Sequence, residues 1–245
     1  MPETTPVFAD LGNTTAKFLL PDGTFIRAKY SDFQFDDIFG ELGNEDIKIV
    51  YSSVNPNAEI QLKQFQDTIN AQTLLTKTNL IKYNQIKGIG ADRLFGLAGA
   101  IFQSKPPIIT IDCGTAVTLN VLNTESEVVG GIIMPGIKLR EYALRTRTTG
   151  LNNIKISPPE YLLGKNTDSA VSAGIYFGIG DAVSSIINRI KTTYKEVTYY
   201  KIFLTGGDSL LILPYLNSSL KINHDELLVI KGIKYIYEKW LTEKK

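Results

Sequence analysis

The chain has 245 residues, a length typical of one large domain or of two smaller ones that share a cleft. Lysine and arginine nearly balance aspartate and glutamate, so the formal charge of +1 gives no sign of the basic surface that binding to nucleic-acid backbones requires. The single cysteine, Cys113, rules out an internal disulfide, and the single histidine, His224, leaves too few residues for a histidine-centred triad or a multi-histidine metal site.

Targeting signals are not visible in this sequence. Residues 1–6 are polar and run straight into a strand-like segment, so we expect no signal peptide. The longest apolar runs, such as residues 108–111, are far shorter than the ~20 residues that cross a bilayer. Together with the lone cysteine, these features predict a soluble protein of the cytoplasm that has no nucleic-acid partner and no membrane partner.

The first predicted element is a β-hairpin with an acidic turn. Residues 7–10 are expected to form a strand, residues 11–14 a tight turn and residues 15–20 the returning strand. A further strand over residues 47–52 leads into a helix predicted over residues 56–69. A hairpin followed by a strand and a helix predicts a mixed sheet with helices packed on it.

A helix is also predicted in the middle of the chain. Apolar residues between positions 94 and 102 keep helical spacing, which predicts a helix over residues 93–103 directly after Asp92. The helix ends before Pro106-Pro107, and we place a domain boundary there. Residues 1–106 are expected to form the N-terminal domain and residues 107–245 the C-terminal domain.

The hairpin pattern recurs in the second half of the chain. Residues 108–111 and 116–122 are expected to be strands on either side of Asp112-Cys113-Gly114-Thr115, and a third strand ends in residues 130–136. A strand over residues 201–205 then leads through Gly206-Gly207-Asp208 into a helix over residues 209–216. Because the acidic turn and the strand-helix unit both recur in order, we predict duplicated domains, each a mixed α/β sheet, that enclose a cleft.

A long helix is predicted over residues 167–190. Its apolar face consists of Val171, Ile175, Ile179, Ile186 and Ile190. Small residues recur at four-residue intervals, namely Ala170, Gly174, Gly178 and Ala182. Small residues at that spacing let another helix approach closely, and the spacing fits packing within the subunit as well as it fits a dimer contact.

The two acidic turns are the candidates for phosphate binding. Neither the P-loop pattern nor Gly-x-Gly-x-x-Gly occurs, whereas both turns leave backbone N–H groups open to anionic oxygens. Asn13, Thr14 and Thr115 offer side-chain hydrogen bonds, and Lys17 adds charge to the first turn. Two such turns in matching positions are much less expected by chance than either one alone.

Each candidate residue also has a purely structural interpretation. These are a helix N-cap for Asp92, a strand-end turn for Asp112, a helix cap for Asn166-Thr167 and a glycine turn for Gly206-Gly207. Cys113 is expected to fill space rather than to act as a nucleophile, because no histidine lies near it in sequence. His224 is expected to be an exposed loop residue.

Taken in order, these residues resemble the type III pantothenate kinases, a family of the acetate and sugar kinase, Hsp70 and actin superfamily. The motifs that carry the resemblance are Asp10-Leu11-Gly12-Asn13-Thr14 with Lys17, Gly90-Ala91-Asp92-Arg93, Asp112-Cys113-Gly114-Thr115-Ala116, residues 130–136, Gly164-Lys165-Asn166-Thr167 and Leu204-Thr205-Gly206-Gly207-Asp208. Each motif alone is unspecific, but the combination covers most of the chain and is highly specific. The least family-like regions are residues 25–43 and the tail after Lys221.

The resemblance implies an actin-like, ribonuclease H-like fold with the active site in the cleft between two domains. It implies a homodimeric enzyme that uses ATP with Mg²⁺ and a monovalent cation, K⁺ or NH₄⁺, to phosphorylate pantothenate to 4'-phosphopantothenate. This reaction is the first step of coenzyme A biosynthesis. The alternatives are another acceptor-specific kinase of the same superfamily and a catalytically silent regulatory relative.

The resemblance also implies the role of individual residues. Asp92 is expected to accept the proton of the pantothenate hydroxyl, Asp112 to bind the monovalent cation, and Asp10 to hold Mg²⁺ through water. Asp92 is expected to need no raised pKa, because the transition state of phosphoryl transfer is loose. The residues expected to bind ATP are Asp10, Leu11, Gly12, Asn13, Thr14, Thr15, Ala16, Lys17, Thr115, Gly206 and Gly207. Those expected to bind pantothenate are Tyr83, Gly90, Ala91, Asp92, Arg93 and, from the neighbouring subunit, Thr167.

Overall fold

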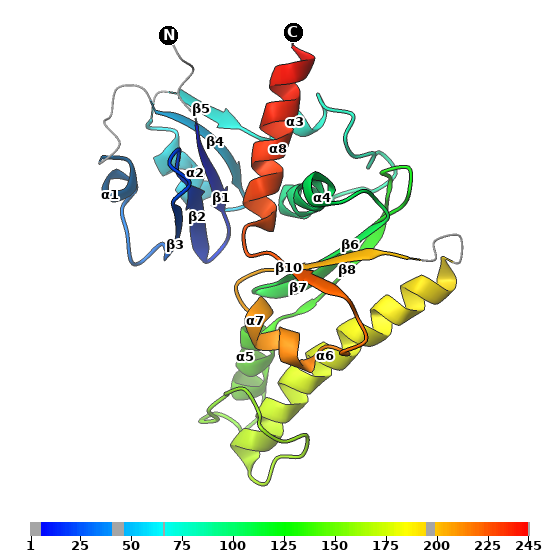
Figure 1. The fold of residues 1–245 in the computed structure, drawn as a ribbon. Helices are drawn as coiled ribbons and strands as arrows, with labels where there is room; N and C mark the ends of the chain where they lie inside the picture. The colour runs from blue at the N-terminus through cyan, green and yellow to red at the C-terminus, as the bar shows by residue number, and fades with distance from the viewer. Residues whose placement is uncertain (1–5, 41–46, 66, 195–198, 245) are drawn as a thin grey trace. The chain divides into compact units, whose positions relative to one another are not determined.

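The computed structural model describes residues 6–40, 47–65, 67–194 and 199–244, and it divides into two compact units (Figure 1). Unit 1 comprises residues 1–105, 126–128 and 227–245, and unit 2 comprises residues 106–125 and 129–226. Each unit has a five-stranded sheet and a hydrophobic core of its own.

The sheet of unit 1 has the strand order β3-β2-β1-β4-β5. Its strands are β1 (Val7–Leu11), β2 (Thr15–Leu19), β3 (Phe25–Lys29), β4 (Lys48–Ser53) and β5 (Asp67–Asn70). β1, β2 and β3 are antiparallel neighbours, whereas β4 and β5 are added in parallel on the other side of β1. Every residue of β1 is buried, as is typical of a central strand that is covered on both faces.

Helices cover both faces of this sheet. Val7, Ala9 and Leu11 share a core with α1 (Phe35–Phe39) and α2 (Pro56–Leu62). On the opposite face, the ring of Phe8 meets Tyr237 of α8 (Leu228–Glu243) edge to face. Unit 1 also contains α3 (Gln72–Leu75) and α4 (Ala91–Gln103).

Two expectations for unit 1 are corrected by the structure. The helix predicted over residues 56–69 is too long, since α2 ends at Leu62 and residues 67–70 pair with β4 as β5. α8 packs in unit 1 and not with the rest of residues 107–245, because α4 and α8 touch backbone to backbone. A Cβ atom at Gly99 or Gly232 would overlap the backbone of the opposite helix, so this contact requires glycine.

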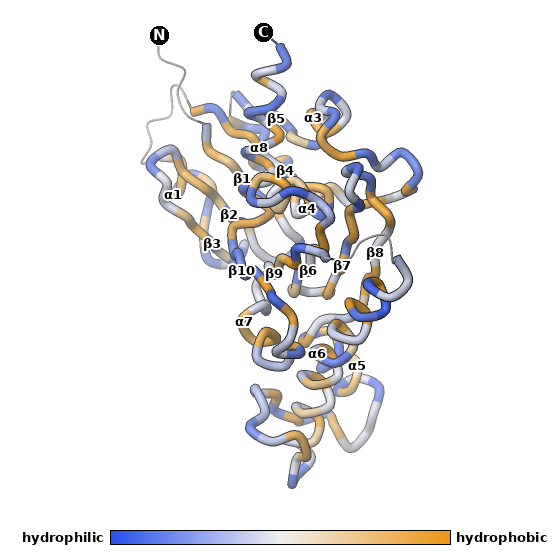
Figure 2. Tube along the Cα trace, turned by 45° about the vertical axis from the view of Figure 1, so that its right-hand side comes forward, coloured by the Kyte–Doolittle hydropathy of each residue, from blue (hydrophilic) through white to orange (hydrophobic). Residues whose placement is uncertain are grey.

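The sheet of unit 2 has the order β10-β9-β6-β7-β8. Read in reverse, from β8 to β10, it matches the order of unit 1 from β3 to β5 strand for strand. Its strands are β6 (Ile108–Cys113), β7 (Ala116–Leu122), β8 (Val128–Pro135), β9 (Lys201–Thr205) and β10 (Ile222–His224). β6 is antiparallel to β7 and parallel to β9, as β1 is to β2 and β4. Hydrophobic residues follow one another along both central strands, β1 and β6 (Figure 2). The predicted duplication of a mixed sheet is therefore confirmed.

The helices of unit 2 are α5 (Ile137–Arg147), α6 (Thr167–Thr193) and the short α7 (Ser209–Ile212). The helix predicted over residues 209–216 is too long. α7 ends at Ile212, and a 3₁₀ turn, η2 (Leu213–Tyr215), follows where Pro214 removes a backbone donor. By length and composition alone α6 could cross a membrane, but half of its most apolar stretch is buried inside the structure. Its residues Ile175, Ile179 and Val183 lie in the core of unit 2, so α6 is built as a core helix.

Candidate active site

The first acidic turn, between β1 and β2, holds an ion pair. Asp10 is near the end of β1, and the strand register places it beside Lys17 of β2 and Ser52 of β4. The Asp10 side chain is 12% exposed, and its Oδ2 atom lies 3.2 Å from Lys17 Nζ. The turn therefore presents a carboxylate whose charge is already partly neutralised by a resident cation.

The backbone of this turn is fixed by hydrogen bonds. Gly12 N donates to Thr15 O at 3.0 Å, and Gly12 O accepts from the hydroxyl of Tyr30 at 2.9 Å. Burial, and next the nearby charge of Asp10, raise the pKa of Tyr30, so this hydroxyl keeps its proton. Leu11 and Ala16 are buried in the core and can offer a ligand only their backbone, whereas Asn13 and Thr14 are exposed.

Asp92 lies at the second position of α4, not at its N-cap. The N-cap is Gly90, which has no side chain to cap the helix, and α4 begins at Ala91. The Oδ1 atom of Asp92 accepts a hydrogen bond from Arg93 N at 2.9 Å. A Cβ atom at Gly90 would overlap this carboxylate, so the glycine makes room for it. The N-cap interpretation of Asp92 is therefore wrong.

The environment of Asp92 changes its acidity. Burial raises the pKa of Asp92, the backbone N–H of Arg93 opposes this rise, and the negative charge of Asp10 adds to it. The pKa of this carboxylate is thus raised, while the expectation that catalysis does not need a raised pKa stays a prediction. Because the charge of Asp10 acts on Asp92, unit 1 brings the first acidic turn and the Gly90-Ala91-Asp92-Arg93 block into one electrostatic environment.

The other residues expected around pantothenate lie in the first turn of α4 and in the chain segment before it. Arg93 is partly buried, and this burial lowers its pKa while the charge of Asp92 opposes the change. Tyr83 is partly buried in the segment before α4, where its carbonyl accepts a hydrogen bond from Ile86 N at 2.9 Å. All of these residues belong to unit 1, whereas Thr167 belongs to unit 2.

The second acidic turn, between β6 and β7, is closed by the loop that follows β9. Asp112 lies beside Thr118 of β7 and Thr205 of β9 in the strand register. Gly206 has a φ of 98°, and a Cβ atom there would overlap the carboxylate of Asp112 and the backbone of Cys113. Asp208 N donates to Cys113 O at 2.8 Å. Glycine at position 206 is therefore required by close approach as well as by backbone conformation.

The same turn also receives the start of α5. Gly136 is the N-cap of α5, and its N–H donates to Thr115 O at 3.1 Å. A Cβ atom at Gly136 would overlap the carbonyl of Gly114, which explains the last glycine of the segment 130–136. Cys113 is fully buried, and burial, with the charges of Asp112 and Asp208, raises its pKa to about 12. Its thiol is inert and fills space, as expected.

Buried hydroxyl groups lie next to the acidic residue of each turn. Among the described residues, Ser52 Oγ, Thr78 Oγ1 and Thr205 Oγ1 are buried without a hydrogen-bond partner. Ser52 is the register partner of Asp10, and Thr205 is the register partner of Asp112. An unpaired buried hydroxyl costs about 1–3 kcal/mol, so these oxygens are suited to a bound group.

These donor sets fit hard cations. A carboxylate and a hydroxyl are the oxygen ligands that Mg²⁺ and K⁺ accept, at Asp10 with Ser52 and at Asp112 with Thr205. In the parts of the chain that the structure describes, no three His, Cys, Asp or Glu side chains gather to hold a metal ion. A cation at either position would therefore need further ligands from phosphate and water, which is how proteins usually bind Mg²⁺.

Thr167 is exposed at the first position of α6, where Asn166 forms the cap. Asn166 Oδ1 accepts from Ser169 N at 2.9 Å, and Ser169 Oγ accepts from Asn166 N at 3.1 Å. Gly164 lies so close to Ala170 that a Cβ atom would overlap its backbone. The capping interpretation of Asn166 is therefore correct, while the cap leaves the side chain of Thr167 exposed.

Several residues around these turns were not predicted from the sequence, namely Tyr30, Ser52, Thr205, Ser209 and His224. For Ser52 and Thr205 a signal existed. Both are hydroxyl residues at the end of the strand that follows the hairpin, so aligning the two repeats would have paired them with Asp10 and Asp112. Tyr30, Ser209 and His224 carry no signal in the sequence, and their places in the site depend on three-dimensional contacts.

Comparison with known proteins identifies the family. The sequence model described as type III pantothenate kinase matches residues 7–189. The type III pantothenate kinase of Sulfurihydrogenibium sp. (strain YO3AOP1) is 34% identical over 250 residues, which cover 93% of this chain and 97% of the relative.

Solved structures agree on the fold. The structure of a conserved putative Baf family transcriptional activator from Campylobacter jejuni is 25% identical, with a TM-score of 0.63 over 95% of this chain and 98% of its own. A putative 2-dehydro-3-deoxygalactonokinase from Sinorhizobium meliloti has a TM-score of 0.58 over 96% of this chain and 98% of its own, and at 11% identity it supports the fold alone. With its duplicated mixed sheets and the matched motifs, the chain has an actin-like fold and belongs to the type III pantothenate kinase family.

Proposed function

We propose that this chain transfers the γ-phosphoryl group of ATP to the primary hydroxyl of pantothenate, with Asp92 as the proton acceptor. The product is 4'-phosphopantothenate, and the reaction is the first step of coenzyme A biosynthesis. The observation that carries the proposal is the environment of Asp92, a partly buried carboxylate that Gly90 makes room for at the start of α4 and that interacts electrostatically with Asp10 of the first acidic turn. A base and a phosphate-binding turn in one environment are what alcohol phosphorylation needs.

The chemistry of the step defines the work of the residues in unit 1. As the hydroxyl oxygen attacks the γ-phosphorus, its proton passes to Asp92 and ADP leaves. Positioning and charge stabilisation supply most of the acceleration, and a carboxylate with a raised pKa holds the proton more firmly. Arg93 pairs with the carboxylate of pantothenate, since a guanidinium can make two parallel hydrogen bonds to it. Tyr83, Gly90 and Ala91 line the same pocket.

The acidic turns bind the nucleotide in this proposal. Residues 11–16, among which Asn13 and Thr14 are exposed, and the ammonium of Lys17 contact the phosphates, and Asp10 holds Mg²⁺, which neutralises phosphate charge when bound. Asp112 with Thr205 holds a monovalent cation, K⁺ or NH₄⁺, and Thr115 contacts ATP. Gly206 and Gly207 let the backbone approach the adenosine part of ATP.

One assay tests the activity. Purified protein with ATP, Mg²⁺ and K⁺ is expected to release ADP with pantothenate and not with glucose, with acetate or without an acceptor. Asp92→Asn serves as the control for contaminating kinases, because the acceptor-dependent release must disappear with it. Release that is equal with all acceptors, or that favours a sugar, would assign the chain to another kinase of the superfamily. No release from folded protein with any acceptor would favour a silent relative.

We also propose that the active enzyme is a cytoplasmic homodimer in which Thr167 contacts the pantothenate of the partner subunit. α6 supports this, because Ala170 and Gly174 are exposed and a Cβ atom at Gly174 would meet nothing within 4 Å. Large apolar side chains are also exposed in the segment before α6, namely Tyr161, Leu162 and Leu163. An exposed apolar surface of this kind is typical of a protein interface.

Mixed dimers test the shared site. Asp92→Asn subunits are combined with Thr167→Val subunits under conditions that exchange them. If Thr167 acts on the partner, one site of each hybrid carries both lesions and the other carries neither, so activity reappears beyond that of either parent. Verified hybrids that recover no activity would restrict Thr167 to its own subunit.

A further inference from the structure

The loop after β9 is held by a buried serine. Gly206 O accepts hydrogen bonds from Ser209 Oγ at 2.6 Å and from Ser209 N at 3.2 Å. Ser209 is 2% exposed, so water does not compete for its hydroxyl. The hydroxyl has one hydrogen, and because a carbonyl oxygen can only accept, that hydrogen is committed to Gly206.

Because the serine hydrogen is donated to Gly206 O, the direction of the hydrogen bond between Ser209 and His224 is fixed. His224 Nε2 lies 2.9 Å from Ser209 Oγ, and since the serine hydrogen is already donated elsewhere, the imidazole must be the donor. Nε2 therefore carries a hydrogen, both in the neutral ring and in the charged one. The result is a chain in one direction, from His224 Nε2–H to Ser209 Oγ–H to Gly206 O.

The sheet holds His224 in place for this contact. His224 is the last residue of β10 and the register partner of Leu204 in β9. The next residue, Asp225, donates its N–H to Leu204 O at 2.9 Å, which continues the pairing beyond the strand. The donor thus comes from the edge strand of the sheet, and the loop that it supports begins directly after the neighbouring strand.

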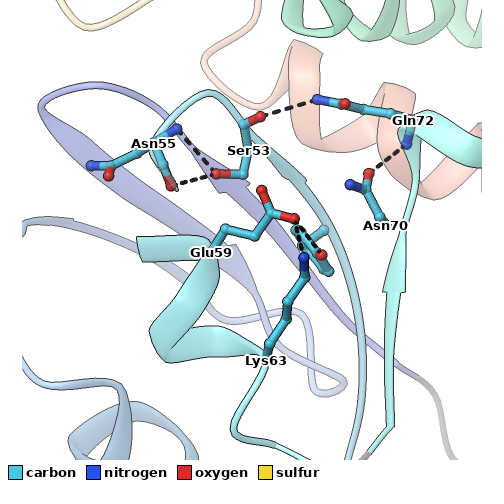
Figure 3. Close-up of polar contacts among 7 residues, drawn as sticks. Ser53, Asn55, Glu59, Lys63, Asn70 and Gln72 are labelled. Carbon is cyan, nitrogen blue, oxygen red and sulfur yellow. Dashed lines mark hydrogen bonds and ion pairs between the residues drawn. The ribbon is translucent and has the colours of Figure 1, made fainter. Parts of the chain in front are cut away.

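Unit 1 contains a comparable hydrogen bond to a main-chain carbonyl, and we call such a side-chain contact a brace. Ser53 follows Ser52 as Gly206 follows Thr205, and Ser53 O accepts from Gln72 Nε2 at 3.0 Å (Figure 3). Gln72 lies just after β5, the strand that corresponds to β10. It is two residues beyond Asn70, which by register with Tyr51 is the position equivalent to His224. In unit 1, therefore, the first residue of α3 holds the last carbonyl of β4, whereas in unit 2 His224, at the end of the edge strand, reaches the carbonyl of Gly206 through Ser209.

We propose that His224 is a positioning residue for nucleotide binding. Through Ser209 it holds the carbonyl of Gly206, and it thereby keeps the backbone of Gly206-Gly207 in the conformation that receives the adenosine part of ATP. The inference rests on the proposed role of this loop in ATP binding. It gives the only histidine of the chain a function.

The first test uses two carboxamides of different reach. The amide nitrogen of glutamine can occupy the position of imidazole Nε2, whereas that of asparagine is one carbon too short. His224→Asn is expected to raise the KM for ATP about threefold to tenfold, the effect of one lost hydrogen bond, with kcat and the KM for pantothenate unchanged. His224→Gln is expected to retain the KM of the native enzyme. Equal KM values for ATP in both variants and the native enzyme would overturn the inference.

A double-mutant cycle tests whether His224 acts through Ser209. Ser209→Ala is expected to raise the KM for ATP at least as much as His224→Asn does. In the Ser209→Ala background, His224→Asn is expected to add nothing, since the acceptor of its hydrogen bond is gone. Additive effects would mean that His224 acts by another route.

Gln72→Ala is the matched control in unit 1. It removes the corresponding hydrogen bond, from Gln72 Nε2 to Ser53 O, and is expected to lower the melting temperature about as much as His224→Asn does. The KM for ATP is expected to stay unchanged. A rise in this KM equal to that of His224→Asn would show that loss of stability alone explains the effect, and would overturn the inference.

Hydrogen exchange separates the brace from the loop assignment. ADP is expected to protect the amides of residues 206–209 in the native enzyme, and to protect them less at equal concentration in His224→Asn. Clear protection in both proteins at the same ADP concentration would overturn the brace and leave the loop assignment intact. Without protection of these amides in the native enzyme, the loop assignment fails and the inference fails with it, even where pantothenate is phosphorylated.

Discussion

The two units have sheets of the same topology, but they differ in the residues beside the aspartate of each acidic turn. Asp10 is paired across the hairpin with Lys17, whereas the equivalent partner of Asp112 is the uncharged Thr118. Unit 1 thus carries its own cation 3.2 Å from the carboxylate. In unit 2 the positions on both neighbouring strands, Thr118 and Thr205, hold hydroxyl groups. The difference teaches that one copy of a duplicated turn can carry a resident cation beside its aspartate while the other places uncharged hydroxyl groups on both sides of it.

The turns differ in length as well. β1 ends at Leu11 and β2 begins at Thr15, so residues 12–14 form the first turn, whereas residues 114–115 form the second between β6 and β7. The longer first turn exposes Asn13 and Thr14. The shorter second turn is packed against Gly206 and Gly136, which leave no room for a Cβ atom. The first turn is therefore open to a ligand, and the second is a close-packed junction.

The largest effect is expected from the base in unit 1. Asp92→Asn removes the proton acceptor at little change in volume and is expected to lower kcat by about 10²- to 10⁴-fold. Circular dichroism is expected to show an unchanged fold. Steady-state ADP release measures kcat, and a variant with near-native turnover would contradict the assignment of Asp92.

The second effect concerns Gly206, a glycine whose equivalent position in unit 1 is occupied by Ser53. Gly206→Ala introduces a Cβ atom that overlaps the Asp112 carboxylate at a positive φ, and we expect the KM for ATP to rise more than tenfold, on the scale of a displaced loop. Ser53→Ala is the matched control at the equivalent position of unit 1 and is expected to leave the KM unchanged. Similar KM values in both variants would remove the distinction between the two loops.

A smaller effect follows from the pKa of Asp92. Its pKa is raised in the folded protein, so the ionised form costs stability, and that cost appears as pH rises through the raised value. Asp92→Asn removes the buried charge and is expected to raise the melting temperature at pH 7 by on the order of a few degrees. Because the base must be ionised, the kcat of the native enzyme is expected to fall as pH decreases through the same raised pKa. A lower melting temperature in calorimetry of the variant would indicate that Asp92 stabilises the helix instead.

The sequence was sufficient for the repeated core of the fold. Both hairpins, β4, β9 and the start of α6 follow from alternation, acidic turns and helical spacing. β5 and β10 were missed because short, polar edge strands have no distinctive pattern, and Leu62, Phe65 and Ile69 keep a spacing that also fits a helix. α8 was not predicted as a helix. Its residues were placed in the C-terminal domain, because the contact with α4 depends on Gly99 and Gly232, which meet only in three dimensions.

The candidate site was predictable where chemistry lies within a motif. Asp10, Asp92, Asp112 and Gly206 each stand in a short pattern that can be read from the chain. That Gly90, and not Asp92, is the N-cap of α4 could not be predicted, because the start of the helix differs by only two residues from the predicted one. His224 could not be predicted either, since its partner Ser209 is distant in sequence and its own neighbours suggest only a polar loop.

The potassium dependence of Thr118→Lys tests the difference between the two turns most directly. This change places a lysine opposite Asp112, in the register that Lys17 has opposite Asp10. An ammonium group there can replace the monovalent cation. We predict that the variant turns over without added K⁺ or NH₄⁺ and still requires Mg²⁺, whereas the native enzyme requires both, and that thermal-shift titration shows K⁺ stabilising the native enzyme but not the variant. A Thr118→Lys enzyme that is active, needs as much K⁺ as the native enzyme and is equally stabilised by it would contradict the account.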